Sequence, residues 1–334
     1  MMRSLYILLL VGLFWSACKN DSANNTTDPA QPAATPVKVP SFNADSAYQH
    51  VVTQVAFGPR VTNSTAHQQC AEWLVAKFKS YGAQVVEQRF TAKAFDGTSL
   101  NGVNIIARYN PGSSRRIFLS AHWDTRPFAD SPLSTERQNE AILGADDGGS
   151  GVAVLLEIAR QLQANPVDIG IDLVLFDAED YGKSDDTPES AYTYGLGSQY
   201  WAKNLPEPGY RPSYGILLDM VGAKNARFSK EEISRRAAGR VLDKIWKLAQ
   251  AMGYGNLFVN DHAGGVTDDH YFVIEGAGIP MIDIINLPPD DPKTPFGDHW
   301  HTHNDNLDII DKRTLRAVGQ VMLAVIYRES GGTL

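Results

Sequence analysis

The sequence predicts an α/β fold: a single domain with a mixed, mostly parallel central sheet and helices on both faces. Two observations support this fold class. Helical patterns alternate with strand patterns along the chain, and the strand segments are continuous apolar runs, which is typical of strands covered on both faces. The composition, 43% hydrophobic and 20% charged over 334 residues, is that of an ordinary globular protein.

Residues 1–18 predict a secretory signal peptide. Arg3 gives a cationic start, an apolar run extends from Leu5 to Trp15, and small residues precede Cys18. This run is too short for a stable membrane span. The "SAC" ending resembles a bacterial lipoprotein signal, in which Cys18 becomes the lipidated first residue; a plain signal peptide cleaved nearby is the alternative. We therefore expect an exported lipoprotein of the bacterial cell envelope, facing the periplasm.

The segment 19–40 predicts a disordered tether, because it has several prolines and almost no large apolar side chains. The folded domain is expected to cover residues 41–334. Cys70 is the one cysteine after Cys18, so this domain must be stable without an internal disulfide. The net charge of −8 argues against nucleic acid as a partner, since phosphate binding needs a basic surface.

Within the domain the elements follow one another with clear signals. The first helix is expected over 64–82, where Ser64 can cap its start and Gly82 its end. The apolar runs that follow predict strands, and the segments with apolar residues at helical spacing predict helices. The expected strands are 101–109, 115–124, 171–177, 214–222 and 279–286, and the further helices are 151–163, 231–253 and 312–329.

Acids and histidines gather where these strands end. In parallel sheets ligands bind at the carboxyl ends of the strands, so these side chains are candidates for one common site. The adjacent acids of "FDAED" are the most unusual, because like charges repel in a cleft unless a cation offsets them. The candidates are His122, Asp124, Glu179, Asp180 and Asp219 at strand ends, Asp146 and Asp147 in a turn, and His299, His301, His303 and Asp305 in "DHWHTHNDN".

Each of these motifs also has a structural interpretation. Asp146 or Asp147 could cap the helix that begins near Gly148, and a lone strand-end acid is usually solvated. The histidines could form a surface patch. Chance assembly of all of them at one sheet edge is much less plausible, and mixed His and carboxylate ligands without cysteine suit a catalytic Zn²⁺ site. Of the acid pair, one would bind the metal and its neighbour would act as a general base.

Six motifs, in order, carry a resemblance that covers the chain from about residue 43 to its end. "AHWDTRP", "GADDGGSGVA", "FDAEDYG", "GILLDMVG", "TDDHYF" and "HWHTHNDN" resemble the family of zinc aminopeptidases and glutaminyl cyclases. "FGPR", "HWDTRP", "LGSQYW" and "TDDH" are similar to bacterial glutaminyl cyclases in particular. The resemblance implies that Asp147, Asp180 and His301 bind zinc and that the peptide bond after Asp147 is cis. It also implies that His299 and His303 do not bind the metal.

The same resemblance implies roles for the remaining site residues. Glu179 matches the general base, while Asp219 and Asp268 match acids that position the substrate amine and the departing group. Trp300 matches an aromatic pocket wall, and Tyr194 stands where bacterial relatives have a pocket tryptophan. The chain departs from animal cyclases at Asp180, where they have Glu, at Asp283, where they have His, and in lacking their disulfide near the site.

Two reactions fit this scaffold. A cyclase would hold one zinc ion and convert the N-terminal glutamine of peptides or proteins to pyroglutamate with release of ammonia. A di-zinc aminopeptidase would hold a second metal through His122 and Asp219, with Asp147 shared, and all three residues are present. A metal-binding lipoprotein without catalysis is a third hypothesis, which the presence of Glu179 disfavours. The sequence leaves the physiological substrates, the metal count and the oligomeric state open.

Overall fold

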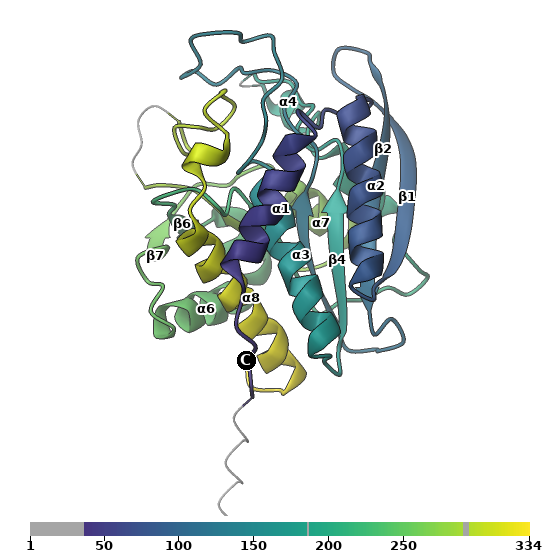
Figure 1. The fold of residues 1–334 in the computed structure, drawn as a ribbon, viewed down its shortest axis with the longest axis vertical. Helices are drawn as coiled ribbons and strands as arrows, with labels where there is room; N and C mark the ends of the chain where they lie inside the picture. The colour runs from purple at the N-terminus through teal and green to yellow at the C-terminus, as the bar shows by residue number, and fades with distance from the viewer. Residues whose placement is uncertain (1–36, 186, 290–293) are drawn as a thin grey trace, which may run out of the picture. The chain divides into compact units, whose positions relative to one another are not determined.

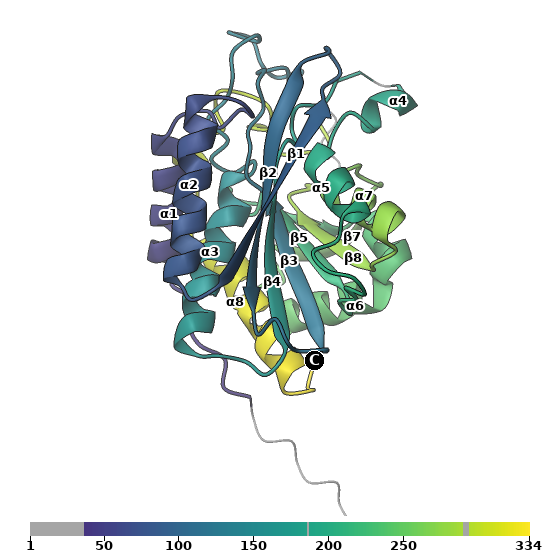
Figure 2. The same ribbon diagram turned by 90° about the vertical axis from the view of Figure 1, so that its right-hand side faces the viewer.

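The structure, a computed structural model, describes residues 37–185, 187–289 and 294–334. These residues form a six-stranded mixed sheet between two layers of helices (Figure 1; Figure 2). The predicted α/β class is therefore confirmed. Residues 1–18, with Cys18, and most of the predicted tether lie outside the described residues.

The sheet has the strand order β1-β2-β4-β3-β5-β8. Its parallel part runs β4-β3-β5-β8, and the antiparallel strands β2 and β1 extend one side. The four parallel strands thus direct their carboxyl ends to a common edge. The strands are β1 (Gln84–Lys93), β2 (Ser99–Tyr109), β3 (Arg116–His122), β4 (Gly170–Phe176), β5 (Gly215–Asp219) and β8 (Met281–Ile285), and a separate two-stranded sheet pairs β6 (Phe228–Lys230) with β7 (Phe258–His262).

Helices cover both faces of this sheet. One face carries α1 (Ala44–Ala56), α2 (Thr65–Ser80), α3 (Gly149–Ala164) and α8 (Lys312–Ser330), and the opposite face carries α5 (Leu196–Lys203) and α7 (Asp269–Ala277) (Figure 2). Along the β8 edge, α6 (Glu232–Ala251) contacts both α7 and α8. The short elements α4 (Pro188–Ala191) and η1 (Leu307–Ile309) lie in connections.

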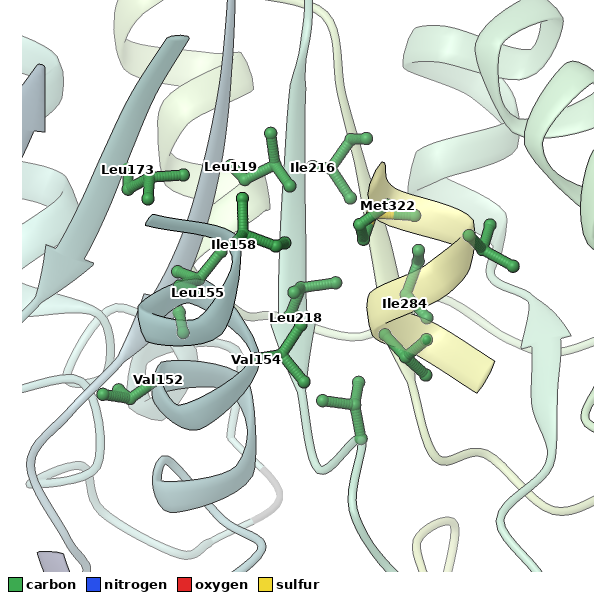
Figure 3. Packing of buried hydrophobic residues seen from close by; sticks show 14 of the residues in the cluster. Leu119, Val152, Val154, Leu155, Ile158, Leu173, Ile216, Leu218, Ile284 and Met322 are labelled. Carbon is green, nitrogen blue, oxygen red and sulfur yellow. The ribbon is translucent and has the colours of Figure 1, made fainter. Parts of the chain in front are cut away.

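The main core lies between the sheet and the α3/α8 layer. In Figure 3, Leu155 and Ile158 of α3 lie beside Leu119 and Leu173 of the sheet. The start of α3 approaches β5 so closely that a Cβ on Gly151 would lie 2.1 Å from the carbonyl oxygen of Leu218. Only glycine permits this approach, and it brings the turn before α3 next to the end of β5.

The sequence prediction was incomplete at the periphery. It missed β1, α1, α5 and α7, along with the small sheet. It also placed the start of the domain at residue 41, whereas Val37 and Val39 already pack against the core. Gln320 Nε2 donates a hydrogen bond to the carbonyl oxygen of Pro40 as well, so the segment 37–40 belongs to the folded domain. Among the described residues, no helix is long and apolar enough to cross a membrane.

Candidate metal and active site

The predicted site residues meet at the carboxyl edge of the parallel strands. β3 ends at His122 and β5 at Asp219, while Glu179 and Asp180 follow β4. A pocket of about 420 Å³ opens at this edge. Eight of the predicted residues line it: Asp147, Glu179, Asp180, Tyr194, Asp219, Asp268, Trp300 and His301.

Two groups of three side chains in this region could each hold a metal ion. Asp147, Asp180 and His301 offer ligand atoms that lie within 4.8 Å of one another, and His122, Asp147 and Asp219 do the same. In the first group, Nε2 of His301 lies 3.0 Å from Oδ1 of Asp180 and 3.7 Å from Oδ2 of Asp147. In the second, Nε2 of His122 lies 3.0 Å from Asp147 and 3.2 Å from Asp219. Asp147 is common to both.

The chemistry of the first group fits zinc. Its donors are two carboxylates and an imidazole, which are typical zinc ligands, and the side chains are buried. Oδ2 of Asp147 and Oδ2 of Asp180 are buried without a hydrogen-bond partner among the described residues. Buried polar atoms normally have partners, so these oxygens are arranged for a ligand.

Asp124 holds the backbone of the acid pair. Its Oδ1 accepts a hydrogen bond from Glu179 N at 3.0 Å and its Oδ2 accepts one from Asp180 N at 3.1 Å. Ala178, just before the pair, adopts a left-handed conformation with φ of +53°. These constraints turn the chain at the end of β4, so that both Glu179 and Asp180 face the pocket.

Burial dominates the electrostatics of Glu179. Burial raises the pKa of this carboxyl well above its usual value; the charge of His122 opposes the shift, and the negative charges of Asp180 and Asp268 add to it. A base with a raised pKa holds a proton more readily than a solvated glutamate does. Burial likewise raises the pKa of Asp219 to about 8.

Asp305 holds the turn that carries Asp147. Its carboxylate accepts hydrogen bonds from Asp146 N at 2.7 Å and from Asp147 N at 3.1 Å. Asp146 points elsewhere: its Oδ1 accepts a hydrogen bond from Gly222 N, and its Oδ2 lies 2.8 Å from Nε2 of His299. The structure therefore brings Asp147, and not Asp146, to the candidate ligands.

Two expectations about this turn differ from the structure. Gly148 is the N-cap residue of α3 and neither acid caps the helix through its side chain, so the capping interpretation was wrong. The peptide bonds of the described residues are all trans, so the cis bond expected after Asp147 is not found. His299 is not part of either three-residue group, as expected, but it is buried and paired with Asp146.

Asp268 lies at the N-terminus of α7 and belongs to neither group of the pocket. Its Oδ1 accepts a hydrogen bond from Asp269 N, whereas its buried Oδ2 has no partner among the described residues. Behind it, Asp268 forms a third compact group with His270 and Asp283. His270 was not among the predicted site residues, although it stands in the motif "TDDH", which could have indicated it.

Aromatic side chains form the pocket wall. The Trp300 ring stacks on His301 at a centroid distance of 3.9 Å and lies 4.7 Å from the ring of Phe296. Tyr194 packs directly over Gly182, where a Cβ would lie 2.3 Å from its ring. A larger groove of about 650 Å³, beside α2, is lined by none of the predicted site residues.

Solved structures of known proteins share this fold. A crystal structure of a Zn-dependent exopeptidase from Parabacteroides distasonis is 50% identical, with a TM-score of 0.83, over 87% of this chain and 99% of that chain. Bacteroides thetaiotaomicron glutaminyl cyclase is 47% identical, with a TM-score of 0.83 and the same coverage of both chains. The resemblance inferred from the six motifs is thus confirmed.

More distant relatives carry both kinds of name. Aminopeptidase YwaD of Bacillus subtilis is 29% identical over 73% of this chain, and the match spans 48% of YwaD. The glutaminyl-peptide cyclotransferase of Gloydius blomhoffii is 26% identical over 66% of this chain, and the match spans 63% of that protein. The chain therefore spans about half the length of the first and under two thirds of the second.

A family model described as peptidase family M28 matches residues 104–326, a range that includes every candidate ligand of the pocket. This match covers more than half of the chain and agrees with the fold and with the zinc-type ligand groups. The chain belongs to peptidase family M28.

Proposed function

We propose that this protein is a zinc-dependent glutaminyl-peptide cyclotransferase, which converts the N-terminal glutamine of peptides or proteins to pyroglutamate and releases ammonia. The observation that carries the proposal is the position of Asp268. It lines the pocket, does not belong to either of the two groups that share Asp147, and has a buried oxygen without a partner among the described residues. A free α-amine is a suitable partner for this oxygen.

Asp147, Asp180 and His301 would hold the metal ion. A zinc ion bound there supplies Lewis-acid polarisation of the substrate γ-carbonyl. The half-buried Trp300 beside His301, with Phe296 and Tyr194, would enclose the glutamine side chain and exclude water. The substrate provides both reacting groups itself, so the pocket has to orient them and move one proton.

Glu179 is the proposed general base and acid. The α-nitrogen forms a bond to the γ-carbonyl carbon, while Glu179 accepts a proton from the amine. The bond between that carbon and the amide nitrogen then breaks, and Glu179 returns the proton to the leaving nitrogen, which departs as ammonia. Asp219 and Asp268, whose buried carboxyls both have raised pKa values, would hold the amine and the leaving group.

A di-zinc aminopeptidase is the second candidate. The observation that favours it is the compact group of His122, Asp147 and Asp219, with distances close to those of the first group. In that reaction a metal-activated water would cleave the first peptide bond. Metal content measured on the purified protein separates the candidates in part, since we expect one zinc ion per chain for the cyclase.

The decisive experiment follows both reactions in the same protein sample. Peptides beginning with glutamine are tested for ammonia release and for a ring-closed product by mass spectrometry, and a leucine chromogenic amide is tested for cleavage. We expect ammonia release that a chelator abolishes, with the peptide uncleaved. Cleavage of the chromogenic amide, or free amino acids from the peptides, would refute the cyclase and support the peptidase.

Glu179→Gln tests the proposed base. It keeps the size of the side chain but removes its proton acceptor, so kcat is expected to fall by about 10²–10⁴-fold while zinc binding is retained. Glu189→Gln is the matched control, because Glu189 is an exposed acid on α4. Full activity of Glu179→Gln would remove Glu179 from the mechanism.

Lipidation of Cys18 and export to the cell envelope are part of the same proposal, and the residues of the signal segment support them. Substrates would then be peptides or protein N-termini outside the cytoplasm. The full-length protein expressed in a bacterium should partition into a detergent phase, whereas Cys18→Ser should stay in the aqueous phase. Equal partitioning of the two proteins would contradict lipidation at Cys18.

A further inference from the structure

Arg126 is a buried cation just behind the candidate zinc ligands. It follows β3 in the segment "HWDTRP" and is 1% exposed. Its Nη1 donates hydrogen bonds to the carbonyl oxygens of Asp180 at 2.9 Å and Gly182 at 2.8 Å. Its Nε and Nη2 donate to the two carboxylate oxygens of Asp130, at 3.0 Å and 2.6 Å. One guanidinium therefore binds the backbone around the candidate ligand Asp180 and, at the same time, the carboxylate of Asp130.

Asp130 in turn reaches another of the candidate ligands. Its Oδ1 lies 3.4 Å from Nδ1 of His301, the ring nitrogen that does not face Asp180. The backbone of the same loop also contacts this histidine, because Ser131 N donates a hydrogen bond to the carbonyl oxygen of His301. His301 needs such support, since its backbone is in the left-handed region, with φ of +52°.

We propose that Arg126 and Asp130 are positioning residues of the zinc site, which fix Asp180 and His301 relative to each other. Asp130 orients the His301 ring through Nδ1 and leaves Nε2 free for the metal. Arg126 holds Asp130 in place and anchors the backbone of Asp180. Carboxylates that hold a ligating histidine in this way typically contribute 10–100-fold in metal affinity. The inference deepens the proposed function, because it rests on Asp147, Asp180 and His301 as the zinc ligands.

The geometry argues for this role over simple charge neutralisation. A lysine would neutralise the nearby carboxylates equally well, but it has no planar fork to bind two carboxylate oxygens and two carbonyl oxygens at once. The guanidinium carbon also lies 5.4 Å from the ring centroid of Tyr194. Displacement of Arg126 should therefore disturb the pocket wall as well as the ligands.

The test measures zinc affinity directly, by competition with a chromophoric chelator, on the full chain with each substitution. Asp130→Ala removes the partner of His301, and Asp130→Asn keeps its size without its charge. Arg126→Lys keeps the charge without the fork. Glu140→Gln is the matched control, because Glu140 is an exposed acid in the same connection. Thermal unfolding of the metal-free proteins shows whether each variant is folded.

We expect the zinc dissociation constant to rise about 10–100-fold in Asp130→Ala, less in Asp130→Asn, and by no more than about twofold in the control. A Co²⁺-loaded sample should show shifted absorption bands in Asp130→Ala, which a purely structural role would not produce. Because Asp130 is 27% exposed, its variants should fold even if Arg126→Lys does not.

The proposal is overturned if folded Asp130→Ala binds zinc as tightly as the unsubstituted protein. This result is distinguishable from failure of the proposed function. If the protein binds zinc but forms no pyroglutamate, the cyclase proposal fails while the affinity ranking of these variants still tests Arg126 and Asp130.

Discussion

Replacement of Asp305 by alanine should destabilise the metal-free protein substantially. The substitution leaves Asp146 N and Asp147 N buried without their acceptor. Each buried N–H that loses its partner costs about 1–3 kcal/mol, so the two together cost about 2–6 kcal/mol. In the native protein, burial of the Asp305 carboxyl is unfavourable for its charged form and raises its pKa to about 7. Replacement by alanine removes this unfavourable burial and offsets part of the loss. The net loss is therefore expected in the lower half of that range, about 2–4 kcal/mol.

The loss should appear in the free energy of unfolding measured with denaturant, in the presence of a chelator so that metal binding does not contribute. Total stabilities of such domains are only about 5–15 kcal/mol, so a loss of this size is easily measured. Asp305→Asn should lose less, because the amide oxygen still accepts one of the two hydrogen bonds.

Asn304→Ala is the matched control for Asp305→Ala. Asn304 is exposed in the same loop, so its replacement should change the stability by less than about 0.5 kcal/mol. If Asp305→Ala lost no more than this control, the reasoning that Asp305 holds the ligand turn would be refuted.

Three further predictions follow from the site and the core. In the metal-free protein, burial raises the pKa values of Asp219 to about 8 and Asp305 to about 7, above the 3.8 of a solvated aspartate. The folded state therefore holds protons that the unfolded chain releases. The thermal midpoint should fall as the pH rises from about 6 to about 8. A rising midpoint would contradict the raised pKa values of Asp219 and Asp305. Trp300→Ala should lower kcat/KM for glutaminyl peptides about 10–100-fold, because apolar contact with the substrate that contributes about 1.5–3 kcal/mol of binding free energy is lost. Unchanged steady-state kinetics would show that Trp300 does not contact the substrate. Cys70 should resist thiol reagents until denaturant is added, since it is fully buried and burial raises its pKa to about 12; peptide-level mass spectrometry would detect labelling of the native state.

The parallel part of the sheet was predictable because burial on both faces leaves a clear sequence signal. β3 and β4 are buried at every position, and most of their residues are apolar. β1 was missed because it lies at the sheet edge, where exposed polar residues interrupt its apolar ones. α1 was missed for a similar reason, since it buries only one face and the polar residues His50 and Gln54 belong to that buried face.

The site was predictable to the extent that strand ends can be located. Once β4 and β5 were placed, the acids that follow or end them had to lie at one edge of the sheet. The residues that hold the ligands in place could not be located in this way from the sequence. Asp124 and Asp305 were seen as candidate ligands, but their carboxylates accept hydrogen bonds from backbone N–H groups instead. The partners of Arg126 depend on how loops pack, which one sequence does not encode locally.

The adjacent acids at the end of β4 can now be explained in electrostatic terms. Asp124 accepts the hydrogen bonds of the backbone N–H groups of Glu179 and Asp180. These N–H groups therefore do not stabilise the carboxylates of the pair, and Asp124 is itself an acid. Arg126 lies close to Asp180 but is shared with Asp130. The chain therefore offsets only part of the negative charge in the pocket. The rest must be offset by protons, as the raised pKa values of these acids indicate, or by a cation. A divalent ion would compete with those protons for the same carboxylates, so metal binding at this edge should release protons and strengthen as the pH rises.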